Sequence, residues 1–236
     1  MTAAFDAHRP VPSTATAATN AAPALWECRG LCHVPPGADG HLFAGLDLRI
    51  LPGTTLLRGG DGRGKTTLLR IIAGEVLPQA GTVVRTEGAA LCWMNPRAMP
   101  GGALDTGHGL PGEPQTPQDW WAEQAARWPQ WNAEALAAHI GGFGLAEHAG
   151  KRMEQLSTGT RRKVLLAAGF ASGAAMVLVD EPVSGLDRPS VGYLRQVLAE
   201  VSAKAFAAPA CRQAVVVAHY DTLGGVPWGR VVDLGD

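Results

Sequence analysis

Short apolar runs and evenly spaced apolar positions alternate along the chain, and each pattern predicts a different kind of element. Residues 42–50 alternate between apolar and polar side chains, which predicts a strand with one buried face. Residues 55–58, 176–179 and 214–218 are mostly apolar runs, typical of strands that are buried on both faces. Val231 and Val232 predict a last strand that closes the sheet.

Helical spacing and helix-capping residues separate these strands. Ser, Thr and Asn accept hydrogen bonds from the first free amides of a helix, so they mark where helices begin. The predicted helices run over residues 65–73, from Thr116 to about 127, from Asn132 to 141–142, from Ser157 to about 171, and after Pro189. A pair of strands is expected over 82–85 and 89–93, and residues 95–115, rich in Pro and Gly, are expected to form a loop.

The order of these elements predicts an α/β fold. Buried strands that alternate with helices favour a mainly parallel sheet, here with an antiparallel β region at its N-terminal side. Residues 116–172 contain only predicted helices, so we expect a helical subdomain inserted into the α/β core. Residues 1–22 hold almost no large apolar side chain and predict a disordered tail, which leaves one domain over 23–236.

Composition and charge narrow the possible functions. The 236 residues are 46% hydrophobic and 17% charged, which suits a globular chain with a sizeable core. The formal net charge of -1 argues against a nucleic-acid partner. No apolar stretch is long enough to span a membrane, so we expect a cytoplasmic chain. The segment Cys28-x-x-x-Cys32-His33 lacks a fourth metal ligand, which favours reduced, buried thiols over a metal site.

A glycine-rich stretch between a predicted strand and a predicted helix carries the strongest chemical signal. Glycines let successive amides curl around phosphates, Lys65 supplies a point charge for the β- and γ-phosphates, and the Thr66 hydroxyl suits Mg²⁺. The pattern Gly-x-x-x-x-Gly-Lys-Thr resembles the phosphate-binding loop of RecA-like P-loop NTPases. The expected nucleotide-binding residues are Gly59, Gly60, Asp61, Gly62, Arg63, Gly64, Lys65, Thr66 and Thr67.

Two acids follow the apolar run at 176–179, where a ligand of a parallel sheet is expected to lie. Asp180 is placed to hold Mg²⁺, directly or through water. Glu181 is placed to act as a general base toward an attacking water. On its own this acidic pair fits a helix cap equally well, so the assignment depends on the other motifs.

The order of motifs gives the chain a specific resemblance from about residue 25 to its end. The chain resembles the ATP-binding subunit of ABC transporters in the order of its motifs: the phosphate loop, Leu156-Ser157-Thr158-Gly159-Thr160-x-Arg162-Lys163, Asp180-Glu181-Pro182, Ser184-Gly185-Leu186-Asp187, and a buried strand ending in His219. The resemblance implies an ATPase with Mg²⁺ that forms an ATP-sandwich dimer and powers a separate membrane permease from the inner face of the membrane. The small size of the chain and the short sequence after His219 are most similar to the haem-exporter (cytochrome c maturation) group of these ATPases.

The same resemblance implies further site residues. Ser157 and Gly159 would bind the γ-phosphate held by the opposite subunit, and Asp187 would lie in the loop that communicates across the dimer. His219 would contact the γ-phosphate within its own subunit. Asn95 is the best-placed amide for the position where the family has a glutamine near Mg²⁺, although it equally suits a simple turn before Pro96.

The chain also departs from the family pattern. Asp61 and Arg63 stand where an Asn and a small residue are usual, and Thr160 replaces a Gln. No tyrosine precedes the core to stack on adenine, for which His33 is a substitute, while Phe43 is expected in the core. These changes keep two alternatives open: a soluble ABC-type ATPase that does not transport, and a nucleotide-binding module with little turnover.

Four tryptophans of the expected helical subdomain have two interpretations. Trp120, Trp121, Trp128 and Trp131 either pack among the helices or form a docking face for a membrane partner, since tryptophan is frequent in interface hot spots.

Overall fold

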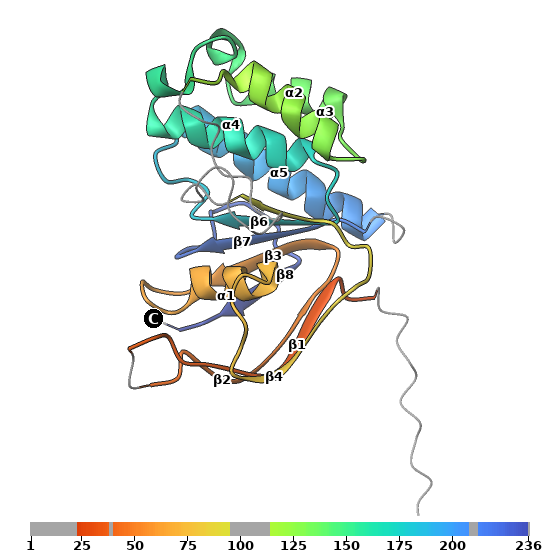
Figure 1. Cartoon of the computed structure of the whole chain (residues 1–236), viewed down its shortest axis with the longest axis vertical. Coiled ribbons are helices and arrows are strands. Elements are labelled where there is room, and N and C mark those ends of the chain that lie inside the picture. The colour runs from red at the N-terminus through yellow and green to blue at the C-terminus, as the bar shows by residue number, and fades with distance from the viewer. Residues whose placement is uncertain (1–22, 38–39, 95–113, 208–211, 236) are drawn as a thin grey trace, which may run out of the picture.

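The computed structural model describes residues 23–37, 40–94, 114–207 and 212–235. These residues form eight strands, five α-helices and two short 3-10 helices (Figure 1). The strands are β1 (Trp26–His33), β2 (Phe43–Ile50), β3 (Gly53–Arg58), β4 (Ala80–Arg85), β5 (Leu91–Met94), β6 (Met176–Asp180), β7 (Ala214–His219) and β8 (Arg230–Asp233). The helices are α1 (Lys65–Ala73), α2 (Pro117–Arg127), α3 (Ala133–Gly142), η1 (Ala146–His148), η2 (Met153–Gln155), α4 (Thr158–Ala171) and α5 (Arg188–Ala207).

The strands form two sheets of different character. Five strands in the order β5-β6-β7-β3-β8 pair in parallel, and three strands in the order β2-β1-β4 pair antiparallel. The predicted α/β class is therefore confirmed, with an antiparallel N-terminal region beside a parallel sheet. Because all five strands of the larger sheet are parallel, the carboxyl ends of β3, β6 and β7 meet at one edge.

One predicted pairing is wrong. The strands expected at 82–85 and 89–93 both exist, but β4 pairs with β1 and β5 pairs with β6, so the two belong to different sheets. Strand β1 was not recognised from the sequence, and it is the partner that β4 needs. Local patterning marks a strand, whereas pairing depends on residues far away in the chain, here β1 and β6.

Alternation along the parallel strands builds a core on each face of the sheet. Leu178 and Val216 pack with α1 and the antiparallel sheet, while their neighbours Val177 and Val217 pack with the helices on the other face. In Figure 1, α1 lies between the two sheets, and α4 and α5 separate the parallel sheet from α2 and α3. Strands buried on both faces explain why these segments are continuous apolar runs.

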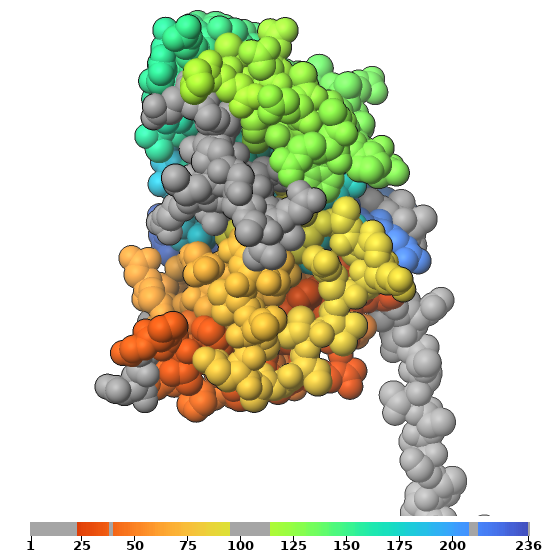
Figure 2. Space-filling model, viewed as in Figure 1, coloured from red at the N-terminus to blue at the C-terminus, as the bar shows by residue number. Residues whose placement is uncertain are grey.

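Helices α2, α3 and α4 begin where their capping residues predict. Thr116, Asn132 and Ser157 accept hydrogen bonds from the amides of Asp119, Ala135 and Thr160, at 3.2, 2.9 and 3.1 Å. Helices α2 and α3 occupy the end of the molecule opposite the antiparallel sheet (Figure 2). The caps fix the start of each helix, and Ser157 thereby fixes where α4 begins.

The tryptophans of this region belong to its core. Trp120 and Trp121 are buried, and Trp121 Nε1 donates to the Val164 carbonyl of α4 at 3.2 Å. Trp128 and Trp131 are half-buried and pack against the same cluster. Contacts between helices thus account for all four side chains, as the packing interpretation predicts.

Two features bear on the remaining predictions. Among the described residues, no helix is both long and apolar enough to cross a membrane.

Cys28 and Cys92 lie in the cores on opposite faces of the parallel sheet, so they cannot share one metal site. Burial raises the pKa of the two thiols to about 11 and about 12. Residues 1–22, the predicted tail, lie outside the described residues.

Candidate functional site

The glycine-rich stretch forms a tight loop between β3 and α1. Gly62 and Gly64 have φ values of 78° and 88°, in the left-handed region that glycine adopts without strain. A Cβ atom on Gly64 would lie 2.8 Å from Phe43 Cζ, closer than a side chain tolerates. Phe43 is buried in the core as expected, so the antiparallel sheet supports this loop from outside.

Lys65, the first residue of α1, holds its ammonium group against the loop. Its Nζ donates to the carbonyl oxygens of Gly59 at 2.7 Å and Gly60 at 2.9 Å. The residue is only 7% exposed, and Nζ lies 4.0 Å from Glu181 Oε1. A buried cation held at the mouth of a helix N-terminus creates a strongly positive point, suited to an anionic ligand.

Thr66 and Asp180 bring a hydroxyl and a carboxylate together. Thr66 Oγ1 donates to Asp180 Oδ2 at 2.7 Å, although the two residues are 114 positions apart. Strand β6 ends at Asp180, beside the start of α1. Hydroxyl and carboxylate oxygens are hard ligands of the kind that Mg²⁺ prefers, so the donor set present here fits this ion.

Glu181 and His219 form the second polar pair of the site. Glu181 Oε2 and His219 Nδ1 lie 2.9 Å apart, and the imidazole is almost fully buried. The hydrogen bond from His219 is the main cause that holds the pKa of Glu181 below its usual range, and the nearby Lys65 and Arg162 cations add to it. Glu181 is therefore kept ionised, as a base requires.

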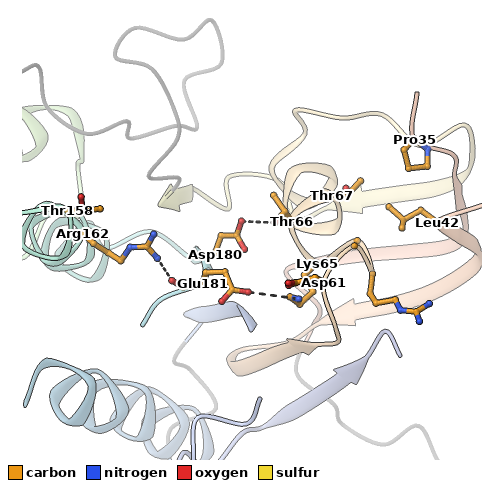
Figure 3. A pocket seen from close by; sticks show the side chains of 13 residues that line it. Pro35, Leu42, Asp61, Lys65, Thr66, Thr67, Thr158, Arg162, Asp180 and Glu181 are labelled. Carbon is orange, nitrogen blue, oxygen red and sulfur yellow. Dashed lines mark hydrogen bonds and ion pairs between the residues drawn. The ribbon is translucent and has the colours of Figure 1, made fainter. Parts of the chain in front are cut away.

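A cavity of about 490 Å³ joins these groups (Figure 3). Its floor consists of loop residues 61–67 together with Asp180 and Glu181. One wall is formed by Thr158 and Arg162 of α4, and the opposite end by Pro35 and Leu42. A volume of this size is typical of small-molecule sites. Asp61, Arg63 and Thr67, expected to bind nucleotide, line the cavity, whereas Gly59 and Gly60 hold Lys65 from beneath.

The predicted signature residues lie at the far end of the site. Ser157 is exposed, and its Oγ is hydrogen-bonded within its own helix end, to Thr160 N and Oγ1. Gly159 is buried, and a Cβ atom on it would lie 2.0 Å from the Gly185 carbonyl oxygen. Asp187 accepts a hydrogen bond from Lys163 Nζ at 2.9 Å, which holds its pKa well below the usual range.

Some predicted and some unpredicted residues complete the description. Asn95 lies outside the described residues. His33 is buried and is not among the described residues that line the cavity, where Pro35 and Leu42 are found instead.

Arg162 has no role assigned from the sequence, yet it lines the cavity and donates to the Glu181 carbonyl. Its place in the stretch Leu156-Ser157-Thr158-Gly159-Thr160-x-Arg162-Lys163, one of the motifs that carry the family resemblance, is the signal that marks it.

A parallel sheet with a glycine-rich loop, a buried lysine and a Thr–Asp pair defines a phosphate-loop nucleotide-binding protein. The sequence model described as ABC transporter matches residues 43–184, which is more than half of the chain. The chain thus belongs to the ABC transporter family, as its motif order predicts. It is an ATP-binding subunit and an ATPase.

Individual relatives give the same result. The chain is 33% identical over 212 residues to the cytochrome c biogenesis ATP-binding export protein CcmA of Alkalilimnicola ehrlichii, a match that covers 88% of this chain and 85% of that protein. It is 30% identical over 185 residues to the Fe(3+) ions import ATP-binding protein FbpC 3 of Rhodococcus jostii, over 70% of this chain and 48% of that protein. Sequence similarity therefore extends to subunits of both exporters and importers.

The fold has solved counterparts. An ABC transporter ATP-binding protein from Pyrococcus furiosus superposes with a TM-score of 0.68 at 18% identity, over 89% of this chain and 96% of that one. At this identity the likeness concerns the fold alone.

Proposed function

We propose that this chain hydrolyses Mg-ATP in the cavity at the carboxyl edge of the parallel sheet, and that two nucleotide-binding subunits close around the ATP to drive a separate membrane permease. The observation that carries the proposal is the convergence of buried Lys65, the Thr66–Asp180 pair and the Glu181–His219 pair at one edge. These groups come from α1, β6, β7 and the segment that follows β6, and together they supply a phosphate site, a metal site and a base.

The phosphate loop and the Thr66–Asp180 pair have different parts in binding Mg-ATP. The loop amides over 61–67 and the ammonium of Lys65 receive the phosphates, in place of the Gly59 and Gly60 carbonyls that now hold that ammonium. Thr66 and Asp180 would hold Mg²⁺ with two hard oxygen ligands. Held there, the ion would offset the negative charge of the phosphates.

The chemical step belongs to Glu181. Its carboxylate accepts a proton from the water that attacks the γ-phosphate, and the bond from that phosphate to ADP breaks as the new bond to water oxygen forms. His219 orients the carboxylate through the 2.9 Å hydrogen bond. Lys65, 4.0 Å from the same carboxylate, keeps it ionised before the water arrives.

The exposed position of Ser157 supports a dimer in which each ATP lies between two subunits. Ser157 lies on the surface and is not among the described residues that line the cavity of its own chain, so its hydroxyl and helix N-terminus can serve a nucleotide held by a second subunit. Gly159 in the first turn of α4 contacts Gly185, and Asp187 at the end of the same segment pairs with Lys163 of α4. We assign all three residues to the interface between paired subunits.

The names of the relatives support an export role and a membrane partner for this chain. CcmA is named as an export protein of cytochrome c biogenesis, and the match spans most of both chains. We assign this chain the same export role, with the subunit bound peripherally to the cytoplasmic face of the membrane. Such a subunit needs a partner that crosses the bilayer, and co-purification of a membrane protein with the tagged chain tests this part directly.

Steady-state ATPase assays test the chemical part. Turnover should require Mg²⁺, and Glu181→Gln should reduce it by roughly two orders of magnitude or more, because the amide keeps the shape but cannot take the proton. ATP affinity should stay within about threefold, because the carboxylate does not hold the phosphates. Parental turnover in the variant would contradict the base role. A chain that binds ATP but never hydrolyses it, even with the permease, would favour the binding-module alternative.

A further inference from the structure

The segment that follows β6 has no regular secondary structure and places Glu181 at its start. Residues 181–187 connect the acidic pair to α5, and Ser184, Gly185 and Asp187 are exposed. Glu181 has a φ of 44°, in the left-handed region that non-glycine residues seldom adopt. Such a backbone persists only where surrounding contacts hold it. The contacts of this segment therefore decide where the Glu181 carboxylate lies.

The Glu181 peptide units are held from two sides. The amide of Glu181 donates to the Ala218 carbonyl of β7 at 3.0 Å. The carbonyl of Glu181 accepts from Arg162 Nη1 of α4 and from the Ser184 amide at 3.3 Å (Figure 3). A guanidinium on a carbonyl is a charge-assisted hydrogen bond, stronger than the neutral bond from Ser184. Arg162 is thus the contact through which α4 holds this strained residue.

The far end of the segment is held by the next residue of α4. Lys163 is buried, and its Nζ donates to Asp187 Oδ2 at 2.9 Å. The other carboxylate oxygen of Asp187 accepts from the Ser190 amide at 2.8 Å, so the same side chain caps α5. The ion pair therefore joins α4 to the point where α5 begins.

Backbone contact closes the middle of the segment. A Cβ atom on Gly159 would lie 2.0 Å from the Gly185 carbonyl oxygen, so the first turn of α4 rests directly on the segment. Gly159, Arg162 and Lys163 therefore touch the segment at its middle, its start and its end. This leaves little freedom for residues 181–187 to move without α4.

We propose that Arg162 and Lys163 are positioning residues, which use α4 to fix the 181–187 segment and thereby set the Glu181 carboxylate between Lys65 and His219. The inference rests on the proposed function, which gives Glu181 the role of base. It also connects two parts of the site. Ser157 caps the start of α4, so a nucleotide that binds at this helix N-terminus also shifts the Glu181 backbone through α4. Arg162 acts through Glu181 rather than on the phosphates.

Nucleotide affinity and turnover of the full chain separate these roles. Arg162→Gln should lower kcat about tenfold, the size expected for losing one charge-assisted hydrogen bond, while Kd for a fluorescent ATP analogue stays within about twofold. Arg162→Lys should recover part of the turnover, because it keeps a charged donor. The matched control is Arg161→Gln: Arg161 Nε donates to the Leu156 carbonyl at 3.2 Å, and its replacement should leave kcat unchanged within about twofold.

Lys163 supplies the second, independent variant. Lys163→Met keeps the apolar stem and removes the ion pair with Asp187, so kcat should fall by about threefold, with Lys163→Arg close to the parent. Combined with Arg162→Gln, the loss should be smaller than the product of the two single losses, because both residues act on one segment. Thermal unfolding of every variant checks the fold, and where Arg162→Gln does not fold, Arg162→Lys and Lys163→Met decide the question.

Three results would overturn the inference. The first is unchanged kcat in both Arg162→Gln and Lys163→Met. The second is a rise of Kd that matches the fall of kcat in Arg162→Gln, which would make Arg162 a phosphate contact. The third is losses in the double variant that multiply fully. Glu181→Gln in the same assay keeps the failures apart: its activity would reject the base role, whereas an inactive Glu181→Gln beside active Arg162 variants rejects only the positioning role.

Discussion

The two ends of the cavity differ in how their polar groups are satisfied. At the phosphate-loop end, Lys65 and the Thr66–Asp180 pair are held by groups of their own chain and are largely shielded from solvent. At the α4 end, Ser157 is exposed and bonds only within its helix terminus. The first end is complete within one subunit. The second presents a helix N-terminus outward, as a surface that a second molecule can use.

This difference fits the proposal that the phosphate-loop end binds ATP within one chain, whereas hydrolysis needs a second subunit. The buried cation and the Thr66–Asp180 pair would receive the phosphates and Mg²⁺. An exposed helix N-terminus gains from an anion only when one is brought to it. The contacts of α4 with residues 181–187 then connect the outward end to Glu181 at the inner end.

Removal of the charge at the inner end has the largest expected effect. Lys65→Ala should weaken ATP binding by roughly two orders of magnitude and abolish turnover, because the buried ammonium held at the phosphate loop is lost. Isothermal titration with ATP and an ATPase assay measure both effects. Lys204→Ala, an exposed lysine on α5, is the matched control and should behave like the parent. Unchanged ATP affinity in Lys65→Ala would reject the phosphate-loop assignment.

A bulky residue at the outward end should give a different loss. Ser157→Arg should abolish ATP-dependent dimerisation, while the monomer keeps its ATP affinity within about twofold, because Ser157 is not among the described residues that line the cavity of its own chain. Titration of a fluorescent ATP analogue and size exclusion separate the two measurements. If affinity in the monomer falls as far as in Lys65→Ala, Ser157 belongs to the same-chain pocket and the contrast between the two ends disappears.

The sequence predicts the inner end well because its signals are local. The loop spacing, the apolar runs and the caps at Thr116, Asn132 and Ser157 all lie within a few residues of what they determine. The sheet partner of β4 and the contact of Arg162 with Glu181 depend on residues far along the chain, and no local pattern reports them.

Site assignments from the family pattern have a similar limit. His33 was chosen as an aromatic ring near the adenine position, yet Pro35 and Leu42 line that end of the cavity. The ring of His33 is buried at the end of β1, because its place in the strand turns it inward. The direction of a side chain depends on strand register, which a lone residue type does not reveal.

The unusual charges of the phosphate loop should give the smallest effect. Asp61 lines the cavity beside the loop amides, where a carboxylate repels phosphates, and Arg63 offsets part of this repulsion. Asp61→Asn should tighten ATP binding about threefold at low salt, and less at high salt, because exposed charges are screened. Glu134→Gln on α3 removes a charge far from the loop and serves as control. A gain that is independent of ionic strength would point to a cause other than charge.

The central proposal is that one ATP lies between the phosphate-loop end of one subunit and the α4 end of a second subunit. Sedimentation velocity of Glu181→Gln without nucleotide, with Mg-ATP, and with Mg-ATP plus EDTA tests this claim most directly. The account predicts a stable dimer only with Mg-ATP, and a monomer once Ser157→Arg is added to the same chain. A Glu181→Gln variant that binds ATP yet sediments as a monomer, or a dimer that forms equally without nucleotide and survives Ser157→Arg, would contradict it.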